Sequence, residues 1–305
     1  MKYVGITLFL FSLLFVGSIH GKTKETGWVF SPVVGINKLD LKVFYETMYN
    51  APFVGTVRIN TDLPEDVEGA SAYPSEQFYF ENKLSARSID MEGGLEARRY
   101  FGKQTDFYIG IGAWETSSEA QDIVVTFPLQ GQRNNRAKYS RRGKLSYTQY
   151  YLGIQHYLSS RKKNFTTYVN LSIRELFDID YEETNVFDFI SGEPKGFKRI
   201  FIFKSQATGL LMLQLGAGAE YRFAERLSFS LEGAYAFHIK DGTLKGVSVN
   251  NDYNEGDGIT TEPLLIRPIN PLLDAGALSE DGVNYQKVKL RFDGWHIVTK
   301  FSIEF

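Results

Sequence analysis

The sequence predicts an all-β fold, an eight-stranded antiparallel up-and-down transmembrane β-barrel with short periplasmic turns and four long extracellular loops. Three observations predict it. Apolar and polar residues alternate with a period of two in separate segments, as they do on the two faces of a strand. The connections between these segments alternate between long and short. After residue 21, no stretch approaches the roughly 18 apolar residues that a transmembrane helix requires.

The first 21 residues have the pattern of a secretory signal peptide. Lys2 gives a short positive region, the apolar run Val4–Val16 follows, and small residues lead to an expected cleavage near Gly21. We therefore expect residues 1–21 to be removed and residues 22–305 to form a single outer-membrane β-barrel domain. A retained N-terminal anchor is the alternative, although the apolar run is short for a bilayer.

The composition narrows the class further. The chain has no cysteine, so it is neither a disulfide-stapled secreted scaffold nor a lipoprotein that carries lipid on a cysteine. The net charge of −2 argues against general binding to nucleic acid. High counts of aromatic residues and glycine, with 24 Phe, 18 Tyr and 28 Gly, suit a barrel whose strands turn half of their residues toward a polar interior.

Alternation is clearest at the C-terminus. In Trp295–Phe305 one parity is mostly apolar and the other includes His296, Lys300 and Glu304, over the length that a tilted strand needs to cross a bilayer. The first segment is less regular, and its parity predicts a bulge near residues 35–38. The eight predicted strands are 27–45, 91–101, 107–114, 145–158, 165–174, 211–223, 227–237 and 295–305.

The connections fall into two classes that alternate strictly. The short ones are 102–105, 159–164 and 224–226, and the long ones are 47–87, 119–143, 186–205 and 241–284. Bacterial outer-membrane barrels have this arrangement, with short turns in the periplasm and long loops outside. The even strand number predicts that both termini lie on the same, periplasmic side. We expect the protein to lie in the bacterial outer membrane.

The polar parity of the strands points into the lumen. An eight-stranded barrel is only wide enough to be filled by its own side chains, so charges inside it must pair. We expect a structural charge network that plugs the lumen, with a gated proton or ion path as the alternative. The predicted lumen residues are Glu92, Glu96, Arg98, Arg174, Glu220, Arg222, Glu232, His296, Lys300 and Glu304.

Candidates for catalysis and metal binding are weak. His238 and His296 suggest a lipid A-modifying hydrolase or acyltransferase only if a serine and a carboxylate join one of them, and no such arrangement is visible. No metal site or cofactor is expected. The acidic stretch 250–258 superficially resembles a calcium loop, but it fails the EF-hand spacing, which leaves only a looser calcium contact open.

The second long connection is strongly basic. Its predicted place near the outer leaflet favours contacts with lipopolysaccharide phosphates, which arginine binds through two N–H groups. A solvated charged loop is the alternative, and the acidic stretches 62–68 and 252–281 offer partners for it. The basic residues are Arg133, Arg136, Lys138, Arg141, Arg142 and Lys144.

Two segments resemble a known family. The stretch Gly216–Tyr235 resembles the penultimate hairpin of the OmpA-type outer-membrane β-barrel superfamily, the small eight-stranded barrels. The terminal alternation with Phe301, Ile303 and Phe305 resembles the signal that the barrel-insertion machinery reads. The resemblance implies fold and location. Because the superfamily includes structural barrels, adhesins, narrow pores and lipid-modifying enzymes, it does not imply one activity. Two-domain members carry a peptidoglycan-binding domain, and none is expected after Phe305.

These observations favour a non-enzymatic surface barrel. We expect a plugged, charge-paired lumen and a structural or adhesin-like role carried by the outer loops. The expected partners are outer-membrane lipid, lipopolysaccharide, the insertion machinery during biogenesis and a possible extracellular ligand, with no nucleic acid. A narrow, porin-like pore for small solutes and a lipid A-modifying enzyme are the two alternatives.

Overall fold

The computed structural model describes most of the predicted barrel. The described residues are 27–45, 48, 53–58, 75–80, 82–87, 89–129, 132–160, 163–192, 196, 198–207, 209–255, 258–262 and 289–305. The predicted signal peptide, the acidic stretch 62–68 and residues 263–288 lie outside them.

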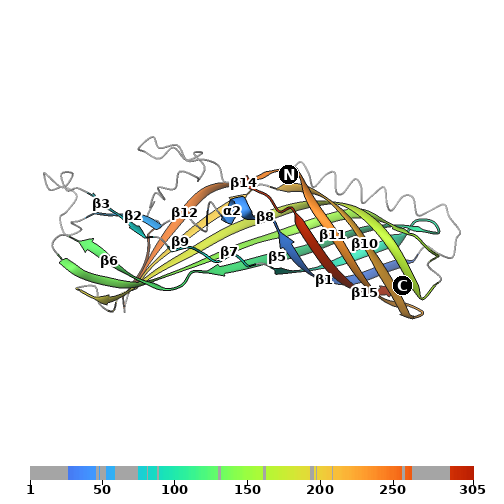
Figure 1. Ribbon diagram of the computed structural model, residues 1–305, viewed down its shortest axis with the longest axis horizontal. Coiled ribbons are helices and arrows are strands. Elements are labelled where there is room, and N and C mark those ends of the chain that lie inside the picture. Colours follow the sequence, from blue (N-terminus) through green and yellow to red (C-terminus); the bar gives the residue numbers. More distant parts are fainter. Residues whose placement is uncertain are drawn as a thin grey trace.

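Eight antiparallel strands close into a barrel, which confirms the predicted fold class (Figure 1). Each strand pairs with the next one around the ring, and β1 pairs with β15 to close it. The order around the ring therefore follows the order along the chain. The barrel strands are β1 (Trp28–Leu39), β4 (Asp90–Tyr100), β5 (Thr105–Glu119), β7 (Gln132–Tyr157), β8 (Phe165–Ser191), β10 (Leu210–Ala224), β11 (Leu227–Lys240) and β15 (Gly294–Glu304).

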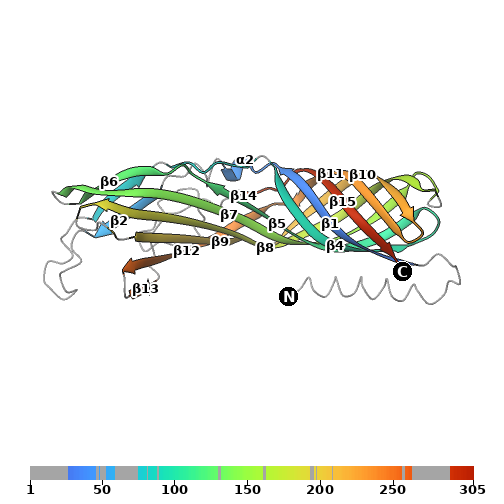
Figure 2. The same ribbon diagram turned by 90° about the horizontal axis from the view of Figure 1, so that it is seen from below.

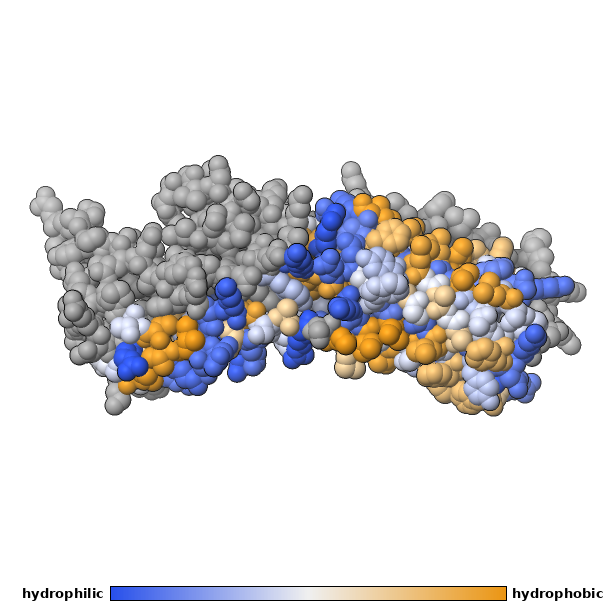
Figure 3. All heavy atoms as spheres, viewed as in Figure 1, coloured by the Kyte–Doolittle hydropathy of each residue, from blue (hydrophilic) through white to orange (hydrophobic). Residues whose placement is uncertain are grey.

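The outer wall of the barrel is apolar. Large apolar side chains are exposed on all eight strands, for example Leu95, Leu171 and Leu231, while their sequence neighbours are buried inside. Apolar residues cover much of the visible barrel face in Figure 3. A water-soluble barrel has the reverse arrangement, so this surface is that of a transmembrane barrel.

The first strand differs from its prediction. It ends at Leu39, and its pairing with β4 and β15 shows no register shift, so the bulge expected near residues 35–38 is absent from β1. The irregular parity arose because Val29 and Val33 are apolar but point inward. A short helix, α2 (Lys42–Phe44), follows the strand. Within the described residues, no helix is both long enough and apolar enough to cross a membrane.

Three of the four long connections carry β-structure that extends the barrel wall. Strands β7 and β8 run for 26 and 27 residues, much longer than a bilayer requires. Their outer halves pair in a twisted sheet of order β6-β7-β8-β9-β12-β13. We call this sheet the extension, and Figure 2 shows it continuing from the end of the barrel that bears the long connections. Its additional strands are β6 (Ile123–Leu129), β9 (Lys198–Ala207), β12 (Gly242–Glu255) and β13 (Gly258–Glu262).

An apolar cluster closes the barrel interior where the extension begins. Leu41 and Phe44 follow β1, and Leu290 and Phe292 precede β15 at β14 (Lys289–Leu290). These side chains pack inward on residues of the wall, so a layer of close-packed apolar atoms separates the lumen from the extension. We call this layer the plug, and its other buried members are Met48, Leu84, Trp114, Leu145, Tyr147, Leu176, Ile179, Tyr181, Leu210, Met212 and Ala236. The remaining described hairpin, β2 (Phe53–Arg58) with β3 (Ser75–Phe80), pairs outside the barrel sheet.

Candidate functional site: the charged lumen and its closure

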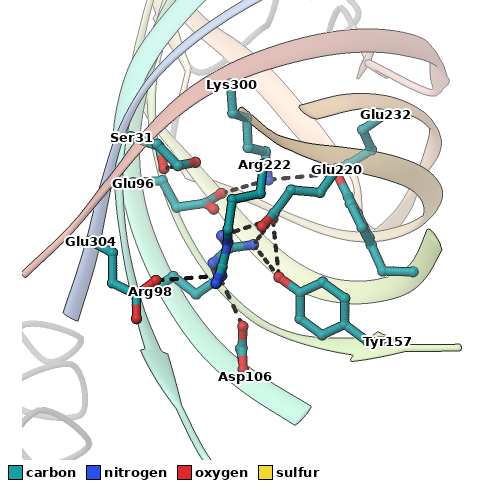
Figure 4. Close-up of polar contacts among 12 residues, drawn as sticks. Ser31, Glu96, Arg98, Asp106, Tyr157, Glu220, Arg222, Glu232, Lys300 and Glu304 are labelled. Atoms are coloured by element: carbon teal, nitrogen blue, oxygen red, sulfur yellow. Dashed lines mark hydrogen bonds and ion pairs between the residues drawn. The ribbon is translucent and has the colours of Figure 1, made fainter. Parts of the chain in front are cut away.

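The lumen is crossed by an ion pair between opposite walls. Arg98 on β4 lies four strands around the ring from Glu220 on β10, and its guanidinium nitrogens Nη1 and Nη2 donate to Glu220 Oε2 at 3.0 and 2.9 Å (Figure 4). The Tyr157 hydroxyl accepts a hydrogen bond from Arg98 and donates one to the same carboxylate oxygen. Asp106 lies 3.6 Å from Arg98 Nε. The single cation is therefore surrounded by two carboxylates and a phenol.

A second cation binds two carboxylates in the same region. Lys300 Nζ on β15 lies 2.9 Å from Glu96 Oε2 on β4 and 3.2 Å from Glu232 Oε2 on β11. Tyr168 donates from its hydroxyl to Glu232 at 3.2 Å. All four side chains are buried, so the charges have exchanged water for one another.

A third polar layer lies directly beneath the plug. His296 Nδ1 lies 3.0 Å from Glu92 Oε1, and Arg174 donates to Gln149 Oε1 at 3.1 Å. The indole N–H of Trp114 donates to Asn37 Oδ1 at 3.0 Å, which connects this layer to the plug. Polar and apolar layers of buried side chains thus follow each other along the lumen.

Two of the predicted lumen charges lie at the barrel mouth instead. Arg222 Nη2 and Glu304 Oε2 are 3.4 Å apart at the short-turn end, with side chains 28% and 29% exposed. Water screens this pair, so it contributes little to stability. The other eight predicted lumen residues all point into the interior and are buried.

The sequence prediction missed several lumen partners. Asp106 follows the inward parity of β5, but the predicted strand began one residue later, at 107. Tyr157 and Gln149 follow the inward parity of β7, whose alternation is less clean in the sequence. Extending the predicted strand by one residue toward its N-terminus would have found Asp106. The tyrosines were missed because their rings were counted as apolar, although their hydroxyls join the network.

The basic connection does not form one phosphate site. Residue 141 lies on the inner face of the extension, where Arg141 is buried and binds both oxygens of Glu183 at 2.7 and 2.9 Å. It also donates to the main-chain carbonyls of Met48 and Asn82. The prediction that Arg141 faces lipid phosphates is therefore wrong, because strand alternation turns it away from Arg142.

The other basic side chains lie on the outer face of β7. Lys138, Arg142 and Lys144 are exposed and each pairs with an acidic residue of a neighbouring strand or turn, at 2.7, 3.3 and 2.7 Å. The acidic partners are Asp122, Glu119 and Glu115, in that order. Arg136 is exposed on the same face, and the side chain of Arg133 lies outside the described residues.

A pocket of about 470 Å³ indents the outer wall where the barrel meets the extension. Strand β8 contains an extra residue there relative to β7, and Asp178 adopts a φ of 47°. This bulge shifts the inward parity of β8 from even to odd residues. The pocket is lined by Met91, Ala113, Trp114, Glu115, Ser146, Tyr147, Thr148, Asp178 and Asp180.

The histidines do not assemble a hydrolase site in the described part of the chain. His296 pairs with Glu92 beneath the plug, and none of its described hydrogen bonds involves a serine. His238 binds main-chain groups at the plug instead. Among the described residues, no group of three histidine and acidic side chains is arranged to hold a metal ion. The acidic stretch 250–258 is not a loop through residue 255, because Asn250–Glu255 belong to β12.

The closed ring, apolar wall and charged interior define a small transmembrane β-barrel. No family model matches the chain, and no curated protein matches it. Among solved structures, it is similar to the outer membrane protein OprG from Pseudomonas aeruginosa, at 13% identity over 92% of this chain and 97% of that one, with a TM-score of 0.42. A FadL homologue from the same organism gives 8% identity, coverage of 92% and 89%, and a TM-score of 0.14. OccAB4 from Acinetobacter baumannii is 9% identical over 93% of this chain and 99% of that one, with a TM-score of 0.11. The fold assignment rests on the strand pairing of this chain itself.

Proposed function

We propose that the chain is a closed, non-enzymatic barrel of the bacterial outer membrane that serves a structural or surface-recognition role through its extension. In this proposal the short turns and both termini face the periplasm, and the extension faces outward. An OmpA-type relationship, with insertion guided by Phe301, Ile303 and Phe305, agrees with the closed eight-strand ring. These three side chains lie on the outer wall near the end of β15.

The observation that carries the proposal is the double closure of the interior. Ion pairs bridge the lumen from wall to wall, and the plug seals the end that faces the extension. A conducting pore needs a continuous wet path, whereas each of these layers fills the bore with side chains. The extension, in contrast, presents a broad sheet beyond the membrane.

Conductance in planar bilayers tests the closure. We expect the purified wild-type barrel at neutral pH to give no unitary current steps. Because the Lys300 and His296 layers remain, the double variant Arg98→Ser with Glu220→Ser is also expected to give no steps. Unitary current steps in the wild type would overturn the closed barrel in favour of the narrow pore.

We also propose that the outer face of β7 contacts lipopolysaccharide. Arg136, Lys138, Arg142 and Lys144 form one exposed row directly beyond the apolar wall, where lipid phosphates would lie. Their acidic partners offset part of this charge, so the contact is expected to be weak in salt and to depend on divalent cations that bridge carboxylate and phosphate.

Charge reversal tests the lipid contact. Changing Lys138 and Lys144 to Glu is expected to lower lipopolysaccharide binding severalfold in a vesicle or co-purification assay. Changing Lys103 and Lys163 to Glu in the short turns makes an equal change of charge at the opposite end and is expected to have no effect. Equal binding by both variants would exclude this surface.

A lipid A-modifying activity is the remaining alternative. The proposal expects mass spectra of lipid A from cells with and without the protein to be identical. A changed acyl pattern that disappears in a His296→Asn variant would support the enzyme and overturn the non-enzymatic assignment, since His296 and Glu92 are the buried histidine–carboxylate pair.

A further inference from the structure

We propose that His238 is a pH-sensitive latch that holds Phe292 in the plug. His238 lies at the end of β11, and Phe292 lies in the segment that leads into β15. The Phe292 main-chain N–H donates to His238 Nε2. This regulation rests on the proposed closed barrel. It concerns the segment before β15, which contributes Phe292 to the plug.

The contacts of the imidazole define its protonation state. Nδ1 lies 3.3 Å from the main-chain oxygen of Lys240, which can only accept, so Nδ1 carries a proton. Nε2 faces an N–H group, so it must supply a lone pair. The latched ring is therefore the neutral tautomer with its proton on Nδ1. A second proton would occupy the lone pair that binds Phe292, and the hydrogen bond would be lost.

Phe292 connects the latch to the aromatic layer of the plug. Its ring contacts Trp114 and Tyr147 edge-on, with centroid separations of 5.9 and 5.1 Å. The two wall aromatics stack on each other at 5.0 Å. All three side chains are buried. Release of the Phe292 backbone would uncover Trp114, which is 2% exposed in the latched state.

The charged groups around His238 do not replace this hydrogen bond. The main-chain N–H of His238 donates to Asp293 Oδ1 at 2.7 Å, which anchors the adjacent residue at any protonation state of the imidazole. Arg291 pairs with Asp241 at 3.3 Å. After β1, the Asp40 carboxylate accepts a hydrogen bond from the main-chain N–H of Lys42. The main-chain N–H of Asp40 donates to the Asp293 carbonyl oxygen at 2.6 Å. The Lys240 side chain is exposed, and β10 places the uncharged Met212 opposite His238. Among these groups the imidazole accepts the Phe292 N–H, so its protonation would remove this hydrogen bond.

Quenching of Trp114 fluorescence by acrylamide tests the latch. Replacing Trp28 and Trp295 on the outer wall by Phe leaves Trp114 as the only tryptophan. In this background, we expect the quenching constant to rise severalfold when the pH is lowered from about 7.5 to about 5, because a proton on Nε2 would remove the acceptor of the Phe292 N–H. Acrylamide is uncharged, so the readout is independent of the electrostatics of the lumen.

Two variants separate the latch from other acid effects. His238→Gln places an amide oxygen within reach of the Phe292 N–H at every pH, so quenching is expected to stay low throughout. Asp293→Asn keeps an oxygen acceptor for the His238 main chain and is expected to respond like the wild type. A flat wild-type response, or a His238→Gln variant that responds like the wild type, would overturn the latch.

The test is distinct from that of the closed barrel. Current steps at neutral pH would contradict the closed barrel whatever Trp114 shows. A silent barrel whose Trp114 fails to respond would contradict only the latch. Retention of the heat-modifiable band shift on gels identifies variants that have folded before either measurement is interpreted.

Discussion

Arg98 and Glu220 join opposite walls of the barrel, with Arg98 Nη2 2.9 Å from Glu220 Oε2 across four strands of the ring. The two residues are 122 positions apart in the sequence. A buried ion pair contributes little to folding stability compared with an apolar pair of similar volume. The loss of one partner, however, leaves the other charge buried without its counter-ion. The interior is therefore sensitive to single changes and tolerant of matched ones.

We expect Arg98→Met to lower the free energy of unfolding by about 3–5 kcal/mol, the usual cost of breaking a buried pair. The double variant Arg98→Met with Glu220→Met is expected to recover part of this loss, because it also removes the buried Glu220 carboxylate that the single variant leaves without Arg98. Urea titration of barrels in liposomes, followed by tryptophan fluorescence, measures both. Arg222→Met at the exposed mouth serves as the control and is expected to cost less than about 1 kcal/mol. A double variant as unstable as the single one would contradict this account.

Close packing between glycines and lumen tyrosines gives a second prediction. A Cβ added at Gly218 would lie 2.6 Å from Tyr168 Cζ and 2.7 Å from the Leu231 carbonyl oxygen. Because Tyr168 also donates to Glu232, its ring has little freedom to move. We expect Gly218→Ala to lower the free energy of unfolding by about 1–3 kcal/mol through overpacking. Gly233→Ala on the neighbouring strand is the matched control, since its added Cβ meets nothing within 4 Å, and equal effects at both sites would contradict the prediction.

The barrel was predictable because alternation is a local signal. In Trp295–Phe305 most residues indicate by their type which face they lie on, and a slip of one residue would expose Lys300 on the apolar wall. The same rule identified Glu96 and Arg98 as inward. It could not identify their partners, because the pairing of Arg98 with Glu220 depends on which strands lie opposite after the ring closes.

The extension was missed for a physical reason. Its strands carry charged residues on the outer face and mixed residues on the inner one, for example Arg142 beside Arg141, so the sequence reads as a basic loop. The bulge at Asp178 also shifts the parity of β8 halfway along its length. The latch was beyond sequence reasoning, because His238 accepts from a main-chain group 54 residues away.

The buried pair of Arg141 and Glu183 gives the extension a pH dependence. Burial alone would raise the pKa of the Glu183 carboxyl, but the charge of Arg141 and hydrogen bonds from Arg141, Tyr181 and Asn185 outweigh it and hold that pKa below its ordinary value of 4.5. A carboxyl whose pKa is lowered by folding stabilises the folded state above the unfolded pKa, and this contribution is lost as the pH falls through the folded value.

We therefore expect amide protection in the outer halves of β7 and β8 to be constant near neutral pH and to fall below about pH 4.5. Hydrogen exchange, corrected for the intrinsic rate at each pH, measures this protection. Glu183→Gln is expected to have low protection at neutral pH and a weaker response to acid, because it leaves Arg141 without its anion. Unchanged acid sensitivity in this variant would assign the effect to other carboxylates.

Two exposed apolar residues test where the membrane lies. Leu231 on the barrel wall and Val124 on β6 of the extension are equally exposed, at 51%. If only the barrel wall meets lipid, a charge at Leu231 must enter hydrocarbon, whereas a charge at Val124 remains in water. We expect Leu231→Arg to lower the free energy of unfolding in liposomes by about 2–4 kcal/mol, the cost near the bilayer midplane.

Val124→Arg is expected to change the free energy of unfolding by less than about 0.5 kcal/mol, because it is a surface substitution in water. The difference between the two variants is more informative than either free energy alone. Both substitutions replace an aliphatic side chain of the same exposure with arginine. In detergent micelles, which adapt around an inserted charge, the difference between the two variants should shrink. Equal costs at both positions in liposomes would place β6 in the bilayer with the barrel and would contradict an extension that lies in water.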